Sequence, residues 1–243
     1  MKSLIILTVF LFSTFTFAAN DVEKIIGTND LVAVKQDASN VPLRFRGLVD
    51  AFGLMSMGCT ATHIGNGYVL TAGHCFWAPE SLVEGTSCAG ETISWGFRED
   101  RKPYLVSKCD VVIAAQHSDR MDFAIIKVSP IPPVAIAPDM QRRAVLGDSL
   151  TIFSHPDELP LQWSRSCGVE SQNYPDLPPD YLQHQCDTNP GSSGATILNL
   201  ISLKVVGIHD GGFVDPASKK GINYGTYILN SPLFDILQRL GFK

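Results

Sequence analysis

One serine, one histidine and one aspartate in this sequence have the residue types and local settings that nucleophilic catalysis requires. Ser193 lies in residues 186–196, a polar stretch that glycines interrupt and that leads into an apolar run. Such a turn can direct one hydroxyl outward, but a serine hydroxyl is a poor nucleophile until a neighbouring base takes its proton. His74 follows an apolar stretch and could be that base. Asp122 opens another apolar stretch and could orient the histidine.

These residues stand in the order His74, Asp122, Ser193, and their local motifs resemble those of the chymotrypsin-like serine proteases. The motifs are Thr-Ala-Gly-His-Cys, Asp-Phe-Ala-Ile-Ile and Gly-Ser-Ser-Gly. The resemblance implies that His74 is the general base, that Asp122 fixes its tautomer and that Ser193 forms the acyl-enzyme. It also implies an oxyanion hole made by the backbone N–H groups of Gly191 and Ser193. Asp119 is the rival carboxylate, but we interpret it as a turn residue because only Asp122 begins the apolar motif.

The stretch 205–212, Val-Val-Gly-Ile-His-Asp-Gly-Gly, resembles the strand that lines the primary specificity pocket in chymotrypsin-like enzymes. Together with Thr188 and the Gly-Ser-Ser-Gly turn, it is most similar to the glutamyl endopeptidases, a bacterial branch. The resemblance implies that Thr188 and His209 recognise an acidic side chain before the scissile bond. It also implies that the substrate pairs with the backbone of Asp210, Gly211 and Gly212.

Asp187 leaves an alternative specificity open. It lies six positions before Ser193, where trypsin-like enzymes keep the aspartate that binds lysine or arginine. An unpaired carboxylate there would repel glutamate. We favour cleavage after glutamate, because a histidine beside the pocket makes most sense if it meets an anion. Trypsin-like cleavage directed by Asp187 is the alternative.

Two other classes of protein compete with an active protease. A catalytically inactive homologue acting as a binding module would usually have lost a triad residue, and none is lost here. An α/β-hydrolase would need Gly-x-Ser-x-Gly, with its acid and then its histidine after the serine, and this chain has neither. We therefore expect a monomeric serine endopeptidase that acts on protein or peptide substrates, without a metal or cofactor.

Composition and the amino terminus indicate an exported protein. The 243 residues carry a formal net charge of −5, which gives no basic field for nucleic acid or an anionic membrane. Residues 1–18 predict a cleaved secretory signal, since their apolar part is shorter than the roughly 20 residues of a membrane-spanning helix. Residues 19–24 would be a short pro-segment or N-terminal extension. The expected location is extracellular or periplasmic.

Lys24 and Ile25 resemble the activation cleavage site of trypsin-like zymogens. In those enzymes the new amino terminus pairs with an aspartate just before the catalytic serine, but here that position is Ser192. A processing site of another kind, or simply the first strand, stays an alternative.

Export makes the six cysteines, an even number, readable as disulfides. Sequence alone allows roughly 15 pairings. The resemblance implies that Cys59 pairs with Cys75, 16 positions on, across the histidine loop. The local pairings then left are Cys88 with Cys109 and Cys167 with Cys186. The rival interpretation is zinc held by Cys59, His63, His74 and Cys75, which uses no familiar ligand spacing and needs reduced thiols.

Short apolar segments separated by turn residues predict an antiparallel all-β protein. The predicted strands are 31–34, 43–48, 58–64, 68–71, 93–97, 108–115, 123–128, 149–154, 161–169, 181–186, 195–198, 205–209 and 225–229. Residues 129–138 contain four prolines and predict a crossing between two halves. Ser231 and Pro232 begin a stretch of helical periodicity, which predicts a closing helix packed on the second half.

The expected fold class is therefore two packed six-stranded antiparallel β-barrels of the chymotrypsin type with a C-terminal α-helix. One protease domain would cover residues 25–243, with the first barrel at about 25–128 and the second at about 139–230. His74 and Asp122 lie before the proline-rich crossing and Ser193 lies after it. A site made from all three would occupy the cleft between the barrels.

Overall fold

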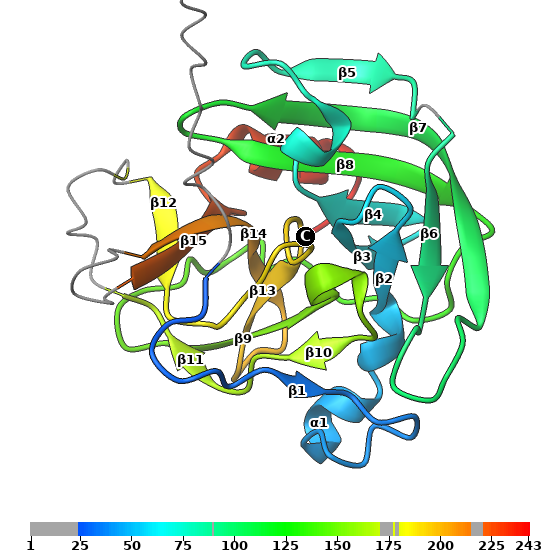
Figure 1. Ribbon diagram of the computed structural model, residues 1–243. Coiled ribbons are helices and arrows are strands. Elements are labelled where there is room, and N and C mark those ends of the chain that lie inside the picture. The colour runs from blue at the N-terminus through cyan, green and yellow to red at the C-terminus, as the bar shows by residue number, and fades with distance from the viewer. Residues whose placement is uncertain (1–23, 89, 171–176, 178–179, 215–220) are drawn as a thin grey trace, which may run out of the picture.

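The computed structural model describes residues 24–243 apart from 89, 171–176, 178–179 and 215–220, and most of its regular elements are β-strands (Figure 1). The expected signal segment and residues 19–23 lie outside the described residues. Two sheets pack together, one formed by the first half of the chain and one mainly by the second. None of the described helices is long and apolar enough to cross a membrane.

The first sheet closes into a barrel. Its strands are β2 (Phe52–Met55), β3 (Thr60–Gly65), β4 (Tyr68–Thr71), β5 (Val83–Thr86), β6 (Thr92–Trp95), β7 (Leu105–His117) and β8 (Asp122–Ser129). Six of them follow the order β7-β6-β2-β3-β4-β8, and β8 pairs back onto β7, while β5 adds to β7 from outside this ring. Asn66 and Gly67, both at positive φ, make the tight turn between β3 and β4.

The second sheet closes through one isolated bridge. Its strands are β1 (Val32–Ala33), β9 (Ser149–Ser154), β10 (Gln162–Trp163), β11 (Cys167–Gly168), β12 (Tyr181–His184), β13 (Thr196–Asn199), β14 (Val205–Val214) and β15 (Gly221–Tyr227). The path runs β1-β10-β9-β13-β14-β15-β12, with β11 paired to β9. Val169, directly after β11, bridges His184 of β12 and completes a second six-stranded ring. The fold class expected from the sequence is thus confirmed.

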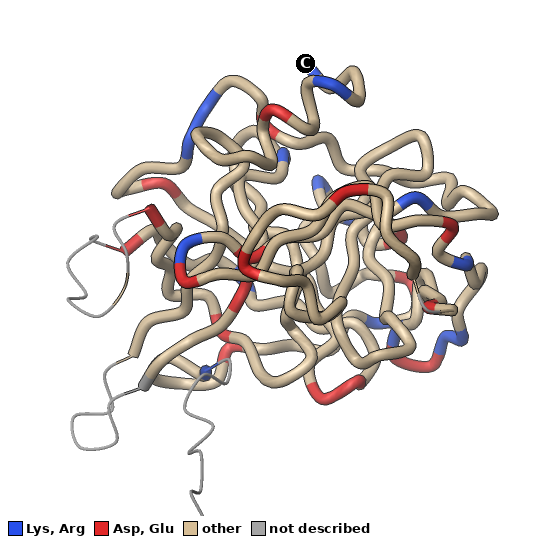
Figure 2. The backbone as a smooth tube through the Cα atoms, turned by 90° about the horizontal axis from the view of Figure 1, so that it is seen from above, with Lys and Arg blue, Asp and Glu red and all other residues tan. Residues whose placement is uncertain are grey.

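The two barrels share one apolar core. Phe52 of β2 stacks on Phe153 of β9 with ring centroids 5.1 Å apart, so aromatic side chains from both sheets meet at the interface. Residues 130–138, after the end of β8, carry the chain from one barrel to the other without forming a strand, as their prolines predict. Figure 2 shows acidic and basic residues interspersed around both barrels.

Residues 43–48 do not form the predicted strand. They form a single-turn helix, α1 (Leu43–Arg46), followed by the 3₁₀ turn η1 (Val49–Ala51). Phe45 is buried against Phe153, with ring centroids 5.7 Å apart, whereas Leu43 is 80% exposed. One buried side chain in four residues is compatible with a helical turn as well as with a strand, so periodicity could not distinguish them.

Two further expectations about the strands are corrected. β1 falls in the range expected for the first barrel, but Val32 pairs with Trp163, so this segment belongs to the second sheet. The predicted strand 161–169 is divided into β10 and β11. Arg165, at φ 59°, turns the chain between them, and the two pieces pair with opposite ends of β9.

The closing helix α2 (Pro232–Arg239) begins after Ser231 as predicted, with proline in its first turn. Its buried residues belong to the apolar cluster that spans both barrels, and the end of the chain also contacts the first barrel. Arg239 forms an ion pair with Glu84 of β5 at 2.5 Å. Phe242, just after the helix, contacts Tyr68 of β4 with ring centroids 6.0 Å apart. The chain therefore crosses back over the interface after β15.

Three disulfides join Cys59 to Cys75, Cys88 to Cys109 and Cys167 to Cys186. These are the pairings that the family resemblance implies, and they leave no thiolate for zinc. His63, the histidine in the rival zinc set, is occupied at both ring nitrogens. Its Nδ1 lies 2.7 Å from the Val134 carbonyl oxygen, and its Nε2 accepts the Gly67 N–H at 3.0 Å.

Candidate active site

Ser193 stands in a turn that two glycines make possible. Gly191 and Gly194 have φ of 97° and 82°, in the region that side chains disfavour. A Cβ on Gly191 would lie 2.6 Å from the His155 carbonyl oxygen, and one on Gly194 would lie 2.6 Å from the Ala72 nitrogen. The turn can approach its neighbours this closely only because both positions lack a side chain.

Thr60 at the start of β3 holds this turn from the first barrel. Its N–H donates to the Ser193 carbonyl oxygen at 2.9 Å. Its hydroxyl donates to the Gly191 carbonyl oxygen at 2.8 Å and accepts the His155 N–H at 2.9 Å. The backbone on both sides of the Ser193 side chain is therefore fixed by a residue from the opposite barrel.

His74 and Asp122 are joined by two hydrogen bonds. The Asp122 Oδ2 lies 2.5 Å from the His74 Nδ1, and Oδ1 accepts the His74 backbone N–H at 2.9 Å. The Asp122 side chain is 5% exposed and the His74 side chain is 31% exposed, so the carboxylate is buried behind a histidine that solvent can reach. The Nδ1 therefore donates to a carboxylate, which leaves Nε2 as the basic nitrogen when the ring is neutral.

The local sequence explains how His74 reaches this position. It begins the 3₁₀ turn η2 (His74–Phe76) directly after β4, and Cys75 in that turn is tied to Cys59 before β3. A Cβ on Gly73 would lie 2.8 Å from the Phe123 carbonyl oxygen, so the turn packs tightly against β8. Gly73 and the Cys59–Cys75 disulfide together hold His74 next to β8, the strand that begins at Asp122.

One cleft of about 930 Å³ brings the three sequence-predicted residues together. His74 and Asp122 reach it from the first barrel and Ser193 from the second. Its other described lining residues include His117, Asp119, Tyr181, Asp210 and Tyr224. The cleft thus has walls from both barrels, as expected for a site divided by the proline-rich crossing.

The peptide before Gly191 has a defined orientation. The Pro190 carbonyl oxygen accepts the Asp157 N–H at 2.5 Å. In a trans peptide the carbonyl and the next N–H point in opposite directions, so the Gly191 N–H points away from Asp157. Ser192, the next residue, is fully buried, and its hydroxyl lies 3.0 Å from that of Ser154.

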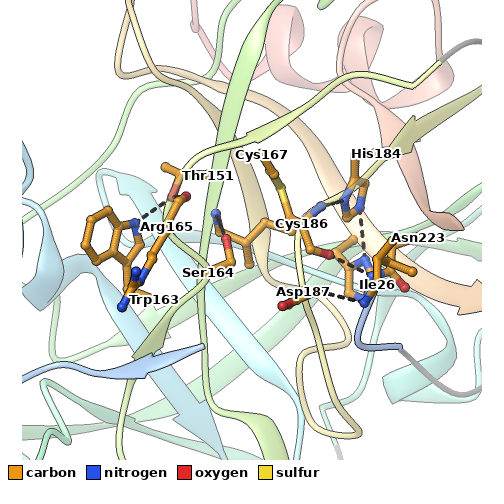
Figure 3. The surroundings of a disulfide bond; sticks show 12 residues. Ile26, Thr151, Trp163, Ser164, Arg165, Cys167, His184, Cys186, Asp187 and Asn223 are labelled. Atoms are coloured by element: carbon orange, nitrogen blue, oxygen red, sulfur yellow. Dashed lines mark hydrogen bonds between the residues drawn. A yellow bond between two sulfur atoms is a disulfide. The ribbon is translucent and has the colours of Figure 1, made fainter. Parts of the chain in front are cut away.

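Asp187 binds the N-terminal segment of the described chain. Its two carboxylate oxygens accept the backbone N–H groups of Ile26 at 2.7 Å and Asp30 at 2.6 Å, the first of which Figure 3 shows. Asp187 is 3% exposed. Burial raises the pKa of its carboxyl above the ordinary value, and the two N–H donors act in the opposite direction. Asp187 is therefore an anchor for backbone rather than an open carboxylate.

Asn223 on β15 extends this anchor. Its side-chain amide donates to the carbonyl oxygens of Lys24 and Cys186, at 2.7 Å each, and its Oδ1 accepts the Lys24 N–H at 3.1 Å. The Thr188 N–H also donates to the Lys24 carbonyl oxygen, at 3.2 Å. Lys24 therefore lies between the strand β15 and the segment that leads to Ser193.

His209 and His184 form a fully buried pair. The Cys186 N–H donates to His184 Nδ1 at 3.2 Å, so the proton of a neutral His184 is on Nε2. That nitrogen lies 3.3 Å from His209 Nδ1 and donates to it, which places the His209 proton on Nε2. This Nε2–H makes no hydrogen bond of normal geometry with a described residue, and neither does the buried Thr188 hydroxyl.

The pKa of both imidazoles falls below the ordinary value. Burial alone lowers the pKa of His184 to about 3. Burial, followed by repulsion from His184 and His74, lowers the pKa of His209 well below its ordinary value, and the Tyr224 carbonyl acts in the opposite direction. Both rings are therefore neutral near pH 7.

Asp210 has a side chain that makes a buried hydrogen bond, whereas the two glycines after it lie where a side chain would be crowded. The Asp210 side chain turns inward and accepts the Thr226 hydroxyl at 2.8 Å. A Cβ on Gly211 would lie 2.8 Å from the Tyr224 hydroxyl, and one on Gly212 would lie 3.2 Å from the Lys24 nitrogen. Side chains would therefore crowd both glycine positions.

Sequence reasoning missed three residues of this region: His184, Asn223 and Thr226. All three are buried on strands β12 and β15. For Asn223 and Thr226 the available signal was a polar residue between apolar residues or glycine in a strand, because a buried polar side chain needs a partner, whereas His184 lies between two glutamines and gave no such signal. The partners themselves come from distant parts of the chain, so the sequence did not reveal them.

In the described part of the chain, two groups of three side chains bring potential metal-ligand atoms close together, and in one of them, Cys59, His74 and Cys75, the two sulfur atoms are joined in a disulfide. In the other, His74, His117 and Asp122 have ligand atoms within 4.8 Å of one another. Two of these residues are already hydrogen-bonded to each other. A metal ion would have to replace the proton between them.

Comparison with known proteins identifies the family. Residues 59–208 match the model of the trypsin-like peptidase domain. A Glu endopeptidase solved in complex with MPD is similar in fold, with a TM-score of 0.61 and 17% identity over 89% of this chain and 98% of its own. A serine endoprotease from Yersinia pestis has a TM-score of 0.56 and 17% identity over 82% of this chain and 66% of its own. No curated protein matches the sequence. The chain belongs to the trypsin-like peptidase family and is a serine endopeptidase.

Proposed function

We propose that His74, Asp122 and Ser193 form the catalytic triad. His74 Nε2 takes the proton of the Ser193 hydroxyl as its oxygen attacks the substrate carbonyl carbon, and then gives that proton to the leaving amine. Water hydrolyses the resulting ester with the same histidine acting as base. Asp122 holds the imidazole in the required tautomer and stabilises its positive charge. The observation that carries this proposal is the His74–Asp122 pair at 2.5 Å in the cleft that Ser193 also lines.

The N–H groups of Gly191 and Ser193 would form the oxyanion hole. Two observations support this role. The Pro190 carbonyl accepts the Asp157 N–H, which turns the Gly191 N–H the other way, and the Ser192 carbonyl accepts the Ala195 N–H at 2.9 Å, which fixes the peptide that carries the Ser193 N–H. Donors fixed in this way need no reorganisation when negative charge develops on the substrate oxygen.

The triad proposal is tested by covalent labelling. An organophosphonate probe should add to one serine in the folded wild-type protein and to none in Ser193→Ala. Peptide mapping after labelling identifies the modified residue. A folded wild-type protein without an adduct would favour an inactive homologue that serves as a binding module.

For specificity we propose cleavage after glutamate. The buried His209 Nε2–H makes no hydrogen bond of normal geometry with a described residue, and neither does the buried Thr188 hydroxyl, so both could donate to a carboxylate. The alternative, selection of lysine or arginine by Asp187, is disfavoured because both oxygens of Asp187 accept backbone N–H groups. The similar Glu endopeptidase supports the fold of the pocket but not its preference. The backbone of residues 210–212 would pair with the substrate.

Matched peptides that differ only in Glu, Gln, Arg or Phe before the scissile bond test this preference. We expect the highest kcat/KM for Glu, and a lower value for the neutral isostere Gln because it lacks the charge. Asp187→Asn should leave the order of the four peptides unchanged. A preference for Arg that Asp187→Asn abolishes would establish the trypsin-like alternative.

We propose that the protein is exported with residues 1–18 as a cleaved signal. Three disulfides support an oxidising compartment. Sequencing the amino terminus of the mature protein tests the signal and also shows whether processing continues to Ile25. An amino terminus at Met1 in the mature protein would contradict both steps.

A further inference from the structure

Asp210 is the extra residue of a β-bulge beside the active site. On β14, His209 pairs with Gly225 and Gly211 pairs with Tyr224, so no residue of β15 stands opposite Asp210. A bulge redirects a side chain that regular pleating would point elsewhere. Here it turns a carboxyl group towards the interface of the two barrels, where Asp210 is only 8% exposed and borders the cleft.

A single hydroxyl joins Asp210 to Asp122. The Asp122 backbone N–H donates to Thr226 Oγ1 at 2.8 Å, and the Thr226 hydroxyl donates to Asp210 Oδ2 at 2.8 Å. A hydroxyl has one proton to donate. Because the Thr226 hydroxyl proton goes to Asp210, a lone pair of the Thr226 oxygen remains to accept the backbone N–H of Asp122. The chain of hydrogen bonds thus starts on β8 of the first barrel and ends on β14 of the second.

The two carboxyl groups are not equivalent acceptors. Asp122 receives two N–H donors from His74, one at each carboxylate oxygen. Asp210 receives the Thr226 hydroxyl at Oδ2, while its buried Oδ1 has no hydrogen-bond partner among the described residues. Two neighbouring buried carboxylates repel each other, so one of them holds a proton. Asp122 has hydrogen-bond donors at both oxygens, whereas the Asp210 Oδ1 has none, and the proton therefore belongs to Asp210.

The surroundings of Asp210 agree with a neutral group. Burial first, and then the charge of Asp122, raise the pKa of Asp210 well above its ordinary value, while Thr226 lowers it. Burial, Asp210 and Asp122, in that order, also raise the pKa of Tyr181. The titratable groups around Asp210 are Asp122 of β8, Tyr181 of β12, Tyr224 of β15, His74 of η2, His209 on its own strand and Asp119 of the hairpin turn. The described residues that line the cleft include no lysine or arginine.

We propose that Asp210, as a neutral carboxylic acid, is a positioning residue that fixes Asp122 behind His74 by accepting the Thr226 hydroxyl. The role rests on the proposed triad. Neutral Asp210 leaves Asp122 as the one negative charge next to the imidazole. An ionised Asp210 would add a second negative charge, which would strengthen proton binding by His74 and move the acid limb of the pH–rate profile to higher pH.

Four variants test the positioning role. Asp210→Ala and Thr226→Val each remove one link, and we expect kcat to fall roughly 10-fold or more while KM changes little. Asp210→Asn and Thr226→Ser keep an acceptor and a hydroxyl, and each should recover most of the lost kcat. The acid limb of kcat/KM in Asp210→Asn should coincide with that of the wild type, since no charge is lost.

Infrared spectroscopy tests the protonation state without any assay of activity. In the Ser193→Ala protein near neutral pH, the carbonyl stretch of a protonated carboxyl should be present, and it should vanish when Asp210→Asn is added. A missing band, or an acid limb that moves to lower pH in Asp210→Asn, would show an ionised Asp210 and overturn the proposal. Wild-type kcat in Asp210→Ala would do so as well. Failure of the triad proposal is separate, because it would appear as full activity in Ser193→Ala.

Discussion

The two barrels bury histidine in different ways. In the first barrel, His63 is 2% exposed and both of its ring nitrogens have hydrogen-bond partners in the backbone. In the second, His184 and His209 are buried against each other, and the Nε2–H of His209 makes no hydrogen bond of normal geometry with a described residue. A satisfied buried group serves the fold, whereas a buried donor without a partner lowers stability until a ligand reaches it.

The same contrast holds for the residues around the cleft. The first barrel contributes a histidine and an aspartate that are bonded to each other. The second contributes Ser193 and Asp210, and the Asp210 Oδ1 has no partner among the described residues. The hydrogen-bonded pair at the cleft thus comes from the first barrel, and the buried acceptor without a partner comes from the second.

The largest expected effect concerns two adjacent serines of the second barrel. Ser193→Ala should lower kcat roughly 10⁴- to 10⁶-fold because the attacking oxygen is removed, while the unfolding free energy stays close to the wild-type value. Ser192→Ala is the matched control. It removes the bond to Ser154 and should cost about 1 kcal/mol of stability with much of the activity retained. Steady-state kinetics and chemical unfolding measure both; the reverse pattern would place the nucleophile at Ser192.

The next effect separates two disulfides of the first barrel. The Cys59–Cys75 and Cys88–Cys109 bonds span 16 and 21 positions, so removing either by paired alanine substitutions should cost about 3 kcal/mol. Only the first adjoins His74. We expect kcat to fall in Cys59→Ala/Cys75→Ala well beyond its fall in Cys88→Ala/Cys109→Ala, measured below both melting temperatures. Equal kcat values in the two proteins would show that the disulfide does not position His74.

A third experiment compares leucine substitutions at two buried histidines, His209 in the second barrel and His63 in the first. His209→Leu should lower kcat/KM for the Glu peptide roughly 10- to 100-fold, since a donor to the charged side chain is lost, and it should also cost about 1 to 3 kcal/mol of stability because the buried His184 Nε2–H loses its acceptor. His63→Leu should leave the peptide preference intact. It should likewise cost about 1 to 3 kcal/mol, because the Gly67 N–H and the Val134 carbonyl lose their partner. Parallel kinetics and unfolding curves give both numbers. Retained Glu preference in His209→Leu would remove His209 from the pocket.

The last expected effect is a pH dependence of stability, which should leave the protein unaffected near neutral pH. Burial, partly offset by the Leu159 carbonyl, lowers the pKa of His155 to about 4, and burial lowers that of His184 to about 3. The unfolded chain therefore binds protons below about pH 6.5 that the folded protein does not. Stability should be fully present above that pH and should fall by about 1.4 kcal/mol per pH unit for each histidine as the pH drops towards 4.

Chemical unfolding at several pH values measures this slope. His184→Gln should reduce the slope by the contribution of one histidine between about pH 6 and pH 4.5. An unchanged slope in that variant would show that His184 keeps access to solvent or that it is protonated in the folded protein.

The sequence predicted best what depends on local pattern. The proline-rich crossing, β4 and β9 with their bounds, and the start of α2 all follow from turn residues and periodicity. The meeting of His74, Asp122 and Ser193 in one cleft agrees with their order along the chain.

Long-range contacts were beyond the reach of local patterns. The pairing of β1 with β10 and the contact of α2 with the first barrel depend on elements more than a hundred residues away. Asp187 was interpreted from its distance to Ser193, yet its partners are N–H groups of residues 26 and 30. Backbone donors have no sequence signature, so that role could be found only in three dimensions.

Two hydrogen bonds described above join the barrels at the proposed site. One runs from the Thr60 N–H to the Ser193 carbonyl, and the other from the Asp122 N–H to Thr226, 104 positions away. Neither can form within a single folded barrel. Peptidase activity during refolding would therefore report the docking of the two halves rather than the folding of either. A chain with only one barrel folded would be inactive, so newly made protein would not cleave its neighbours during synthesis.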